Sequence, residues 1–113
     1  MTVATVHLVD DKGLPLPGIA GLYAVRVGES LVKFGHSRNL ASRLVSHHRS
    51  LRHLGCGFTA AYIERADSSA AERDLLARLD RAGFERSPSS EAFTIAWPVA
   101  LRFLAASAQR GAA

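Results

Sequence analysis

Two short runs rich in β-forming residues constrain the fold of this chain more than any other feature. Gly21–Val27 and Leu31–Gly35 are separated by a loop at residues 28–30 that has the length of a hairpin connection. Two runs joined so closely pair as antiparallel neighbours, because parallel strands need a much longer crossover. The sequence therefore predicts a β-hairpin at Gly21–Gly35.

A helix is predicted directly after the hairpin, because Ser37 or Asn39 can act as its N-cap and Gly55 as its stop. The other predicted elements are an edge strand within Val3–Val9, a strand at Gly57–Glu64, a helix from Asp67 to about Ala82, a short strand at Ala92–Ala96 and a helix at Val99–Ala108 that Pro98 begins. This order, β-β-α-β-α-β-α after the edge strand, predicts an α+β fold with a small antiparallel β-sheet flanked by helices. The length predicts one domain over residues 1–113 with its core at residues 19–106.

Positive charge gathers in and around the first predicted helix. The chain carries a net charge of +4, and the window from His36 to His53 holds four arginines, four of the five histidines and no acidic residue. This window alone therefore accounts for the net charge. Two explanations of this basic patch are equally good: a solvated helix face, or a surface that binds a phosphate-rich partner.

Helical periodicity sorts the side chains of this helix into an apolar stripe and a basic face. The stripe consists of Leu40, Leu44, Leu51 and Leu54, and the opposite face carries Arg38, Arg49 and Arg52. Arg43 and His47 are one turn apart at the edge of the stripe, facing the sheet. A guanidinium beside leucines needs an anionic partner, so either an internal carboxylate pairs with Arg43 or a phosphate enters a cleft beside it.

The remaining composition bears on compartment and on partners. The single cysteine, Cys56, can form neither an internal disulfide nor a cysteine-based zinc site, and the apolar runs fall well short of the ~20 residues of a membrane span. The first residues do not have the pattern of a signal peptide. We therefore expect a cytoplasmic protein with no membrane partner.

The hairpin and the helix resemble the GIY-YIG nuclease superfamily. Gly21-Leu22-Tyr23 matches its first motif, and Lys33-Phe34-Gly35 matches its second motif with lysine in place of tyrosine. The sequence of these motifs is most similar to that of a compact phage and bacterial branch of the superfamily. The resemblance extends to a late Glu-x-Phe-like motif at Glu91–Phe93. The late asparagine of better-known members has no counterpart here. The positions that follow the second motif correspond to Ser37, Asn39, Arg43 and His47.

The resemblance implies a metal-dependent DNA endonuclease that hydrolyses phosphodiester bonds at a single-metal site. Glu72 would bind Mg²⁺ or Mn²⁺, and Arg43 would contact the scissile phosphate. Tyr23 would position or deprotonate the attacking water, His47 would orient it or act as an auxiliary base, and Lys33 would add a phosphate contact. General DNA binding is assigned to Arg38, Arg49, Arg52 and His36. A domain this small makes few base contacts, so sequence specificity would need a partner protein or an oligomer.

Structural explanations compete with these roles. Tyr23 also suits a core position, and Lys33 also suits an exposed hairpin position. Ser69 and Glu72 form a capping-box pattern, in which the glutamate bonds back to its own helix start; an N-cap at Asp67 or Ser68 would release it. Two other functions stay open: a catalytically inactive GIY-YIG-like module that only binds nucleic acid, and a protein-interaction module without a nucleic-acid role.

Overall fold

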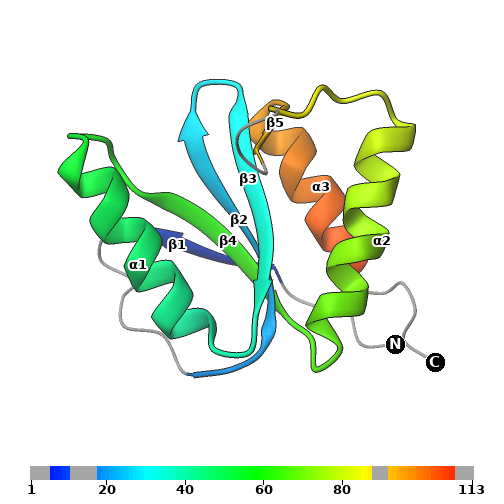
Figure 1. Cartoon of the computed structure of the whole chain (residues 1–113), viewed down its shortest axis with the longest axis horizontal. Coiled ribbons are helices and arrows are strands. Elements are labelled where there is room, and N and C mark those ends of the chain that lie inside the picture. The colour runs from blue at the N-terminus through cyan, green and yellow to red at the C-terminus, as the bar shows by residue number, and fades with distance from the viewer. Residues whose placement is uncertain (1–5, 11–17, 88–91, 109–113) are drawn as a thin grey trace.

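The computed structural model describes residues 6–10, 18–87 and 92–108, which form an antiparallel sheet with helices on both faces (Figure 1). The five strands are ordered β1-β4-β2-β3-β5 across the sheet. Their bounds are β1 His7–Asp10, β2 Gly21–Gly28, β3 Leu31–Ser37, β4 Thr59–Glu64 and β5 Ala92–Thr94, and the helices are α1 Leu40–His53, α2 Ser68–Arg81 and α3 Trp97–Ser107. The predicted α+β class is confirmed.

Most predicted elements occur within a few residues of their predicted bounds. Pro98 is the second residue of α3 rather than its first, because the helix already begins at Trp97. Residues 3–5 of the predicted edge strand and Glu91 of the late motif lie outside the described residues. None of the described helices is long and apolar enough to cross a membrane.

The predicted hairpin forms the middle of the sheet. β2 pairs with β3 through a turn at Glu29 and Ser30, and β4 pairs with the other edge of β2. The register places Tyr23 opposite Gly35 and Val25 opposite Lys33. Because directly opposed residues of an antiparallel pair lie on the same face, these four positions share one face of the sheet.

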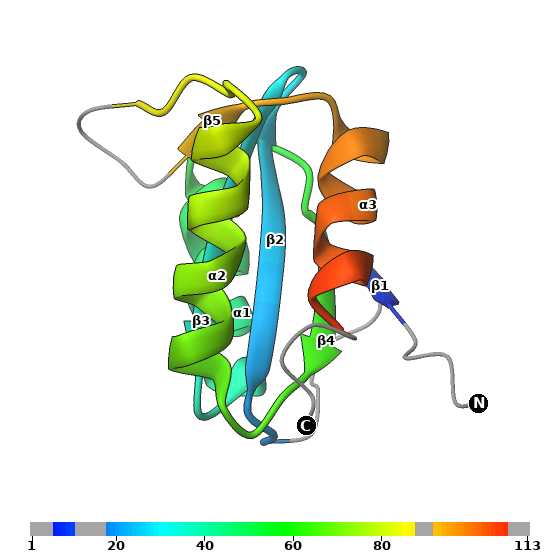
Figure 2. The same ribbon diagram turned by 90° about the vertical axis from the view of Figure 1, so that its right-hand side faces the viewer.

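Side chains alternate along β2 between two separate cores. Figure 2 shows α2 and α3 in front of the sheet and α1 behind it. Tyr23 and Val25 face α1, whereas Leu22 and Ala24 pack with α2 and α3 on the other face. The sheet is therefore covered on both sides, and its two faces carry different sets of polar residues.

The ends of α1 agree with the predicted caps. Asn39 is the N-cap, and its side chain accepts a hydrogen bond of 3.1 Å from the amide of Ser42. Gly55 has φ +74°, a conformation that favours glycine beyond a helix end. The predicted leucine stripe is correct for three leucines but wrong for Leu54, which is 76% exposed because the helix ends at His53 and leaves Leu54 at the C-cap.

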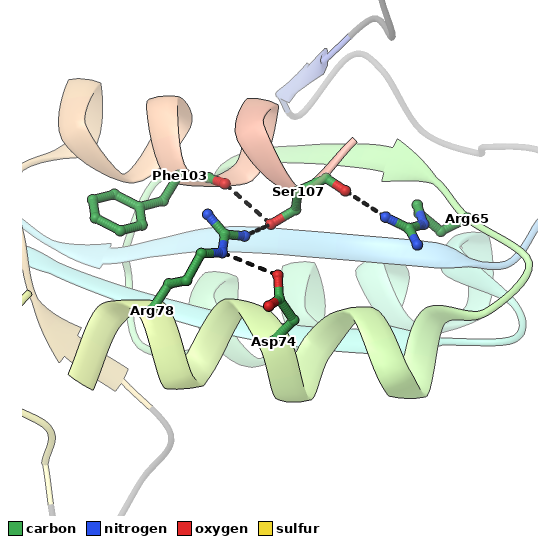
Figure 3. A network of polar contacts seen from close by, with 5 residues as sticks. All are labelled: Arg65, Asp74, Arg78, Phe103 and Ser107. Carbon is green, nitrogen blue, oxygen red and sulfur yellow. Dashed lines mark hydrogen bonds and ion pairs between the residues drawn. The ribbon is translucent and has the colours of Figure 1, made fainter. Parts of the chain in front are cut away.

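Two arginines fasten the C-terminal end of α3 to the rest of the fold (Figure 3). Arg65 donates to the backbone oxygen of Ser107, and Arg78 donates to the Ser107 hydroxyl and to Asp74 Oδ2, the latter at 3.1 Å. The Ser107 hydroxyl in turn donates to the Phe103 carbonyl. Because Ser107 is 1% exposed, these bonds satisfy polar groups that water does not reach.

We expect Arg78→Met to lower the free energy of unfolding by about 1–2 kcal/mol, because it removes charge-assisted hydrogen bonds while keeping an apolar stem. Urea unfolding followed by circular dichroism measures this change. Arg81→Met is the matched control, since Arg81 is exposed at the end of the same helix. Equal stability of the two variants would show that the network contributes nothing.

Candidate active site

Tyr23 lies on β2, the central strand of the sheet, and its side chain extends over the neighbouring strand β3. It is 4% exposed, and its hydroxyl lies over Gly35, the residue directly opposite it in the sheet. A Cβ added at Gly35 would lie 2.3 Å from Tyr23 Oη and 2.5 Å from Cζ. The glycine of the second motif therefore leaves the space that the tyrosine of the first motif occupies.

His47 of α1 contacts the Tyr23 hydroxyl on the face of the sheet that α1 covers. The distance from His47 Nε2 to Tyr23 Oη is 3.1 Å. Burial, together with the positive charges of Lys33 and Arg43, lowers the pKa of His47 to about 4. The imidazole is therefore neutral at pH 7. When Nδ1 carries the ring proton, Nε2 accepts a hydrogen bond from the Tyr23 hydroxyl.

This low pKa predicts that stability falls as the pH drops from about 6.5 to about 4. In that window an unfolded chain protonates His47 and the folded chain does not, so protons favour unfolding. Because His47 is only half-buried, solvent screening reduces the effect to about 1–2 kcal/mol.

Urea unfolding across this pH range tests the prediction through His47→Gln, which should lose less stability on acidification than the wild type. His48→Gln is the control, since His48 is half-buried on the same helix and packs edge-on against Phe58. Parallel pH profiles for the wild type and His47→Gln would contradict the low pKa.

Lys33 and Arg43 bring positive charge to the same face. Lys33 is half-buried on β3, two residues before Gly35 and on the Tyr23 face of the strand. Arg43 is one helical turn before His47 and is exposed, so the expected burial beside leucines does not occur. Within the described residues Arg43 makes no ion pair, so an internal carboxylate does not hold it there. It instead lines a surface pocket with Ser37, Asn39, Ser42 and Ser46.

Glu72 lies on α2, against the opposite face of the sheet. The N-cap of α2 is Asp67, whose carboxylate pairs with Arg65, so the predicted capping box at Ser69 does not form. Glu72 Oε1 is 3.8 Å from Nε2 of His36, a β3 residue that the sequence assigned only to DNA binding. The alternation of a strand places His36 on the face opposite to Gly35, but it does not indicate which residue of α2 lies beside it.

The two groups of side chains lie on opposite faces of β3, near the same end of the strand. Gly35, beneath Tyr23, and His36, beside Glu72, are consecutive residues of β3, so their Cα atoms are about 3.8 Å apart. β5 pairs with β3 at residues 31–33, and no described strand pairs with the outer edge of residues 34–37. This edge lies between α1 and α2 (Figure 1). That Tyr23, Arg43 and Glu72 line one cleft stays a prediction.

The basic face of α1 lies outside this edge. Arg49 and Arg52 are exposed on α1, as the helical periodicity predicted, and Arg38 is exposed just before the N-cap of the helix. Arg49 and Arg52 line a surface depression together with Ser50 and His53. The arrangement leaves these guanidinium groups available to a phosphate backbone, and their role in DNA binding stays a prediction.

The donor set near Glu72 is sparse. In the described part of the chain no three histidine, cysteine, aspartate or glutamate side chains converge as a metal site. One carboxylate is compatible with Mg²⁺ or Mn²⁺ nonetheless, because such an ion keeps several water ligands and takes substrate phosphate oxygens. The Glu72 side chain is 17% exposed, so water can reach it.

Together the described side chains offer a neutral proton acceptor and two cations on one face of β3 and a carboxylate on the other face. General bases and fixed positive charges are the groups that phosphodiester hydrolysis requires. A comparison of the chain with protein-family models, with curated proteins and with solved structures finds no match.

Proposed function

We propose that this chain is a metal-dependent DNA endonuclease of the GIY-YIG type that hydrolyses phosphodiester bonds at the edge of β3 formed by residues 34–37. The observation that carries the proposal is the 3.1 Å contact between Tyr23 Oη and His47 Nε2 above Gly35. A nearly buried phenol bound to a neutral imidazole, with cations beside it, suits the removal of a proton from water next to a phosphate.

The chemistry assigns a separate role to each side chain. Tyr23 Oη accepts a proton from the attacking water while its own proton passes to His47 Nε2. The guanidinium of Arg43 binds the scissile phosphate, and Lys33 adds a second positive charge. Glu72 holds a divalent ion, Mg²⁺ or Mn²⁺, which supplies further neutralisation of the charge that develops on the phosphate.

The basic face of α1 supports DNA as the substrate. Exposed arginines at Arg38, Arg49 and Arg52 attract any phosphate backbone regardless of its sequence. We therefore expect little intrinsic sequence preference, with specificity supplied by a partner protein or by an oligomer. The one cysteine, Cys56, is exposed, which suits a reducing compartment such as the cytoplasm.

A nucleic-acid-binding module without turnover is the second candidate function. The exposed basic face does not depend on the Tyr23 site, and Lys33 stands where the second motif has its tyrosine. Such a module would bind DNA and leave it intact.

Nicking of supercoiled plasmid with Mg²⁺ or with Mn²⁺ separates the two functions. We expect open-circular product that depends on the metal ion. Fluorescence anisotropy with labelled duplex DNA, measured over a range of salt concentrations, gives binding independently. Salt-dependent binding without any cleavage would favour the binding module, and loss of both would refute a nucleic-acid role.

A further inference from the structure

We propose that His36 and Glu72 together bind one divalent ion, so that the chain binds Mn²⁺ more tightly than Mg²⁺. The inference rests on the proposed function only in taking Glu72 as a metal ligand. His36 lies on β3 and Glu72 on α2, and their facing atoms are Nε2 and Oε1. Imidazole nitrogen is a better ligand for transition metals than for magnesium, which prefers oxygen.

Ser68 orients the imidazole of His36 for this role. His36 Nδ1 is 3.4 Å from the Ser68 hydroxyl oxygen, and Ser68 is 4% exposed as the first residue of α2. When Nδ1 carries the ring proton it points at Ser68, and the lone pair of Nε2 points toward Glu72. Metal-binding histidines commonly have their second nitrogen held in this way.

The spacing of the two donor atoms also fits an ion between them. At 3.8 Å, Nε2 and Oε1 are farther apart than a hydrogen bond allows. Two ligands that each lie ~2.1 Å from one ion in adjacent octahedral positions are about 3.0 Å apart. The flexible glutamate side chain can supply the difference of roughly 0.8 Å by a small torsional change.

The surroundings leave the other coordination positions accessible. The side chain of His36 is 35% exposed and that of Glu72 is 17% exposed. His36 follows Gly35 directly in β3. An ion bound to His36 therefore lies beside the same end of the strand as the Tyr23 hydroxyl, but on the opposite face of the sheet. Water and a bound phosphate can therefore complete the coordination.

Mn²⁺ binding to the full chain without DNA, followed by electron paramagnetic resonance, tests the inference. We expect His36→Ala to weaken Mn²⁺ binding about tenfold or more. Mg²⁺ binding, measured by competition, should change by no more than about twofold, since magnesium gains little from the imidazole. His36→Asn is the second variant in case alanine disturbs the fold, and His48→Ala is the control on α1. In the wild type, Mn²⁺ should broaden the nuclear magnetic resonance signals of the His36 ring before those of His48.

The outcomes separate this inference from the proposed function. Equal Mn²⁺ affinity of the wild type and both His36 variants, or no Mn²⁺ binding by the wild type, would overturn the two-ligand site. Plasmid nicking in that case would leave the nuclease proposal standing. Conversely, His36-dependent Mn²⁺ binding in a protein that never cuts DNA would support the site and refute the nuclease.

Discussion

Replacing Tyr23 by phenylalanine should lower the rate of DNA cleavage by about 10²–10⁴-fold, the range that a positioned proton-transfer group contributes. The variant keeps the ring that fills the core beneath α1 and loses only the hydroxyl that contacts His47. Single-turnover cleavage of supercoiled plasmid, with the protein in excess and at concentrations that saturate the DNA, measures this rate. Loss of one hydrogen bond should cost about 1 kcal/mol of stability, so the fold should persist.

Tyr62→Phe is the matched control for this prediction. Tyr62 pairs with Tyr23 across β2 and β4, lies in the same core and is 7% exposed, but its ring stacks on His7 rather than on the candidate site. Its cleavage rate should equal that of the wild type. Wild-type cleavage by Tyr23→Phe would remove the tyrosine from the mechanism.

Arg43→Ala should lower the cleavage rate by about 10²–10³-fold, the cost of removing one fixed donor to a charged transition state. Arg43 makes no ion pair within the described residues, so its removal leaves no described carboxylate without a partner and should barely change stability. Arg43→Lys should recover only part of the rate, because lysine keeps the charge but loses the planar fork. Single-turnover cleavage and urea unfolding separate the two effects.

Arg52→Ala provides the contrast on the same helix. Arg52 is exposed on the basic face, where it lines the depression with Arg49. Its removal should weaken DNA binding and reduce the slope of log affinity against log salt by about 1, with no change in the single-turnover rate once all the DNA is bound by protein. If Arg43→Ala behaves in this same way, Arg43 is a general DNA contact rather than part of the reaction site.

Local signals were sufficient to predict the hairpin and α1. The turn between β2 and β3, the Asn39 cap and Gly55 each act through neighbours within a few residues, so their effect is readable from the sequence. Leu54 shows the limit of periodicity. The last residue of a repeating pattern is buried only if the helix extends that far, and here the helix ends one residue earlier.

The candidate site was predictable only on its α1 side. Arg43 and His47 are four residues apart, so they lie on the same side of the helix. The sequence could therefore predict that both are near the hairpin. The contact of His36 with Glu72 depends on how α2 docks against β3, and no spacing in the chain encodes that. The start of α2 was also open in the sequence, because Asp67, Ser68 and Ser69 are all good N-caps. The ion pair of Asp67 with Arg65 accompanies the observed N-cap at Asp67.

The double variant Arg43→Ala/Glu72→Gln tests most directly whether this strand edge carries out the reaction. The two residues approach β3 from α1 and α2, and neither is in the basic face that is expected to hold the DNA. Metal-dependent cleavage of plasmid should disappear in this variant, while anisotropy still detects salt-dependent binding of duplex DNA. The double variant Arg102→Ala/Glu64→Gln, which changes two exposed residues outside the site, should cut at the wild-type rate. Cleavage that survives in Arg43→Ala/Glu72→Gln would contradict the assignment of the reaction to the edge of β3.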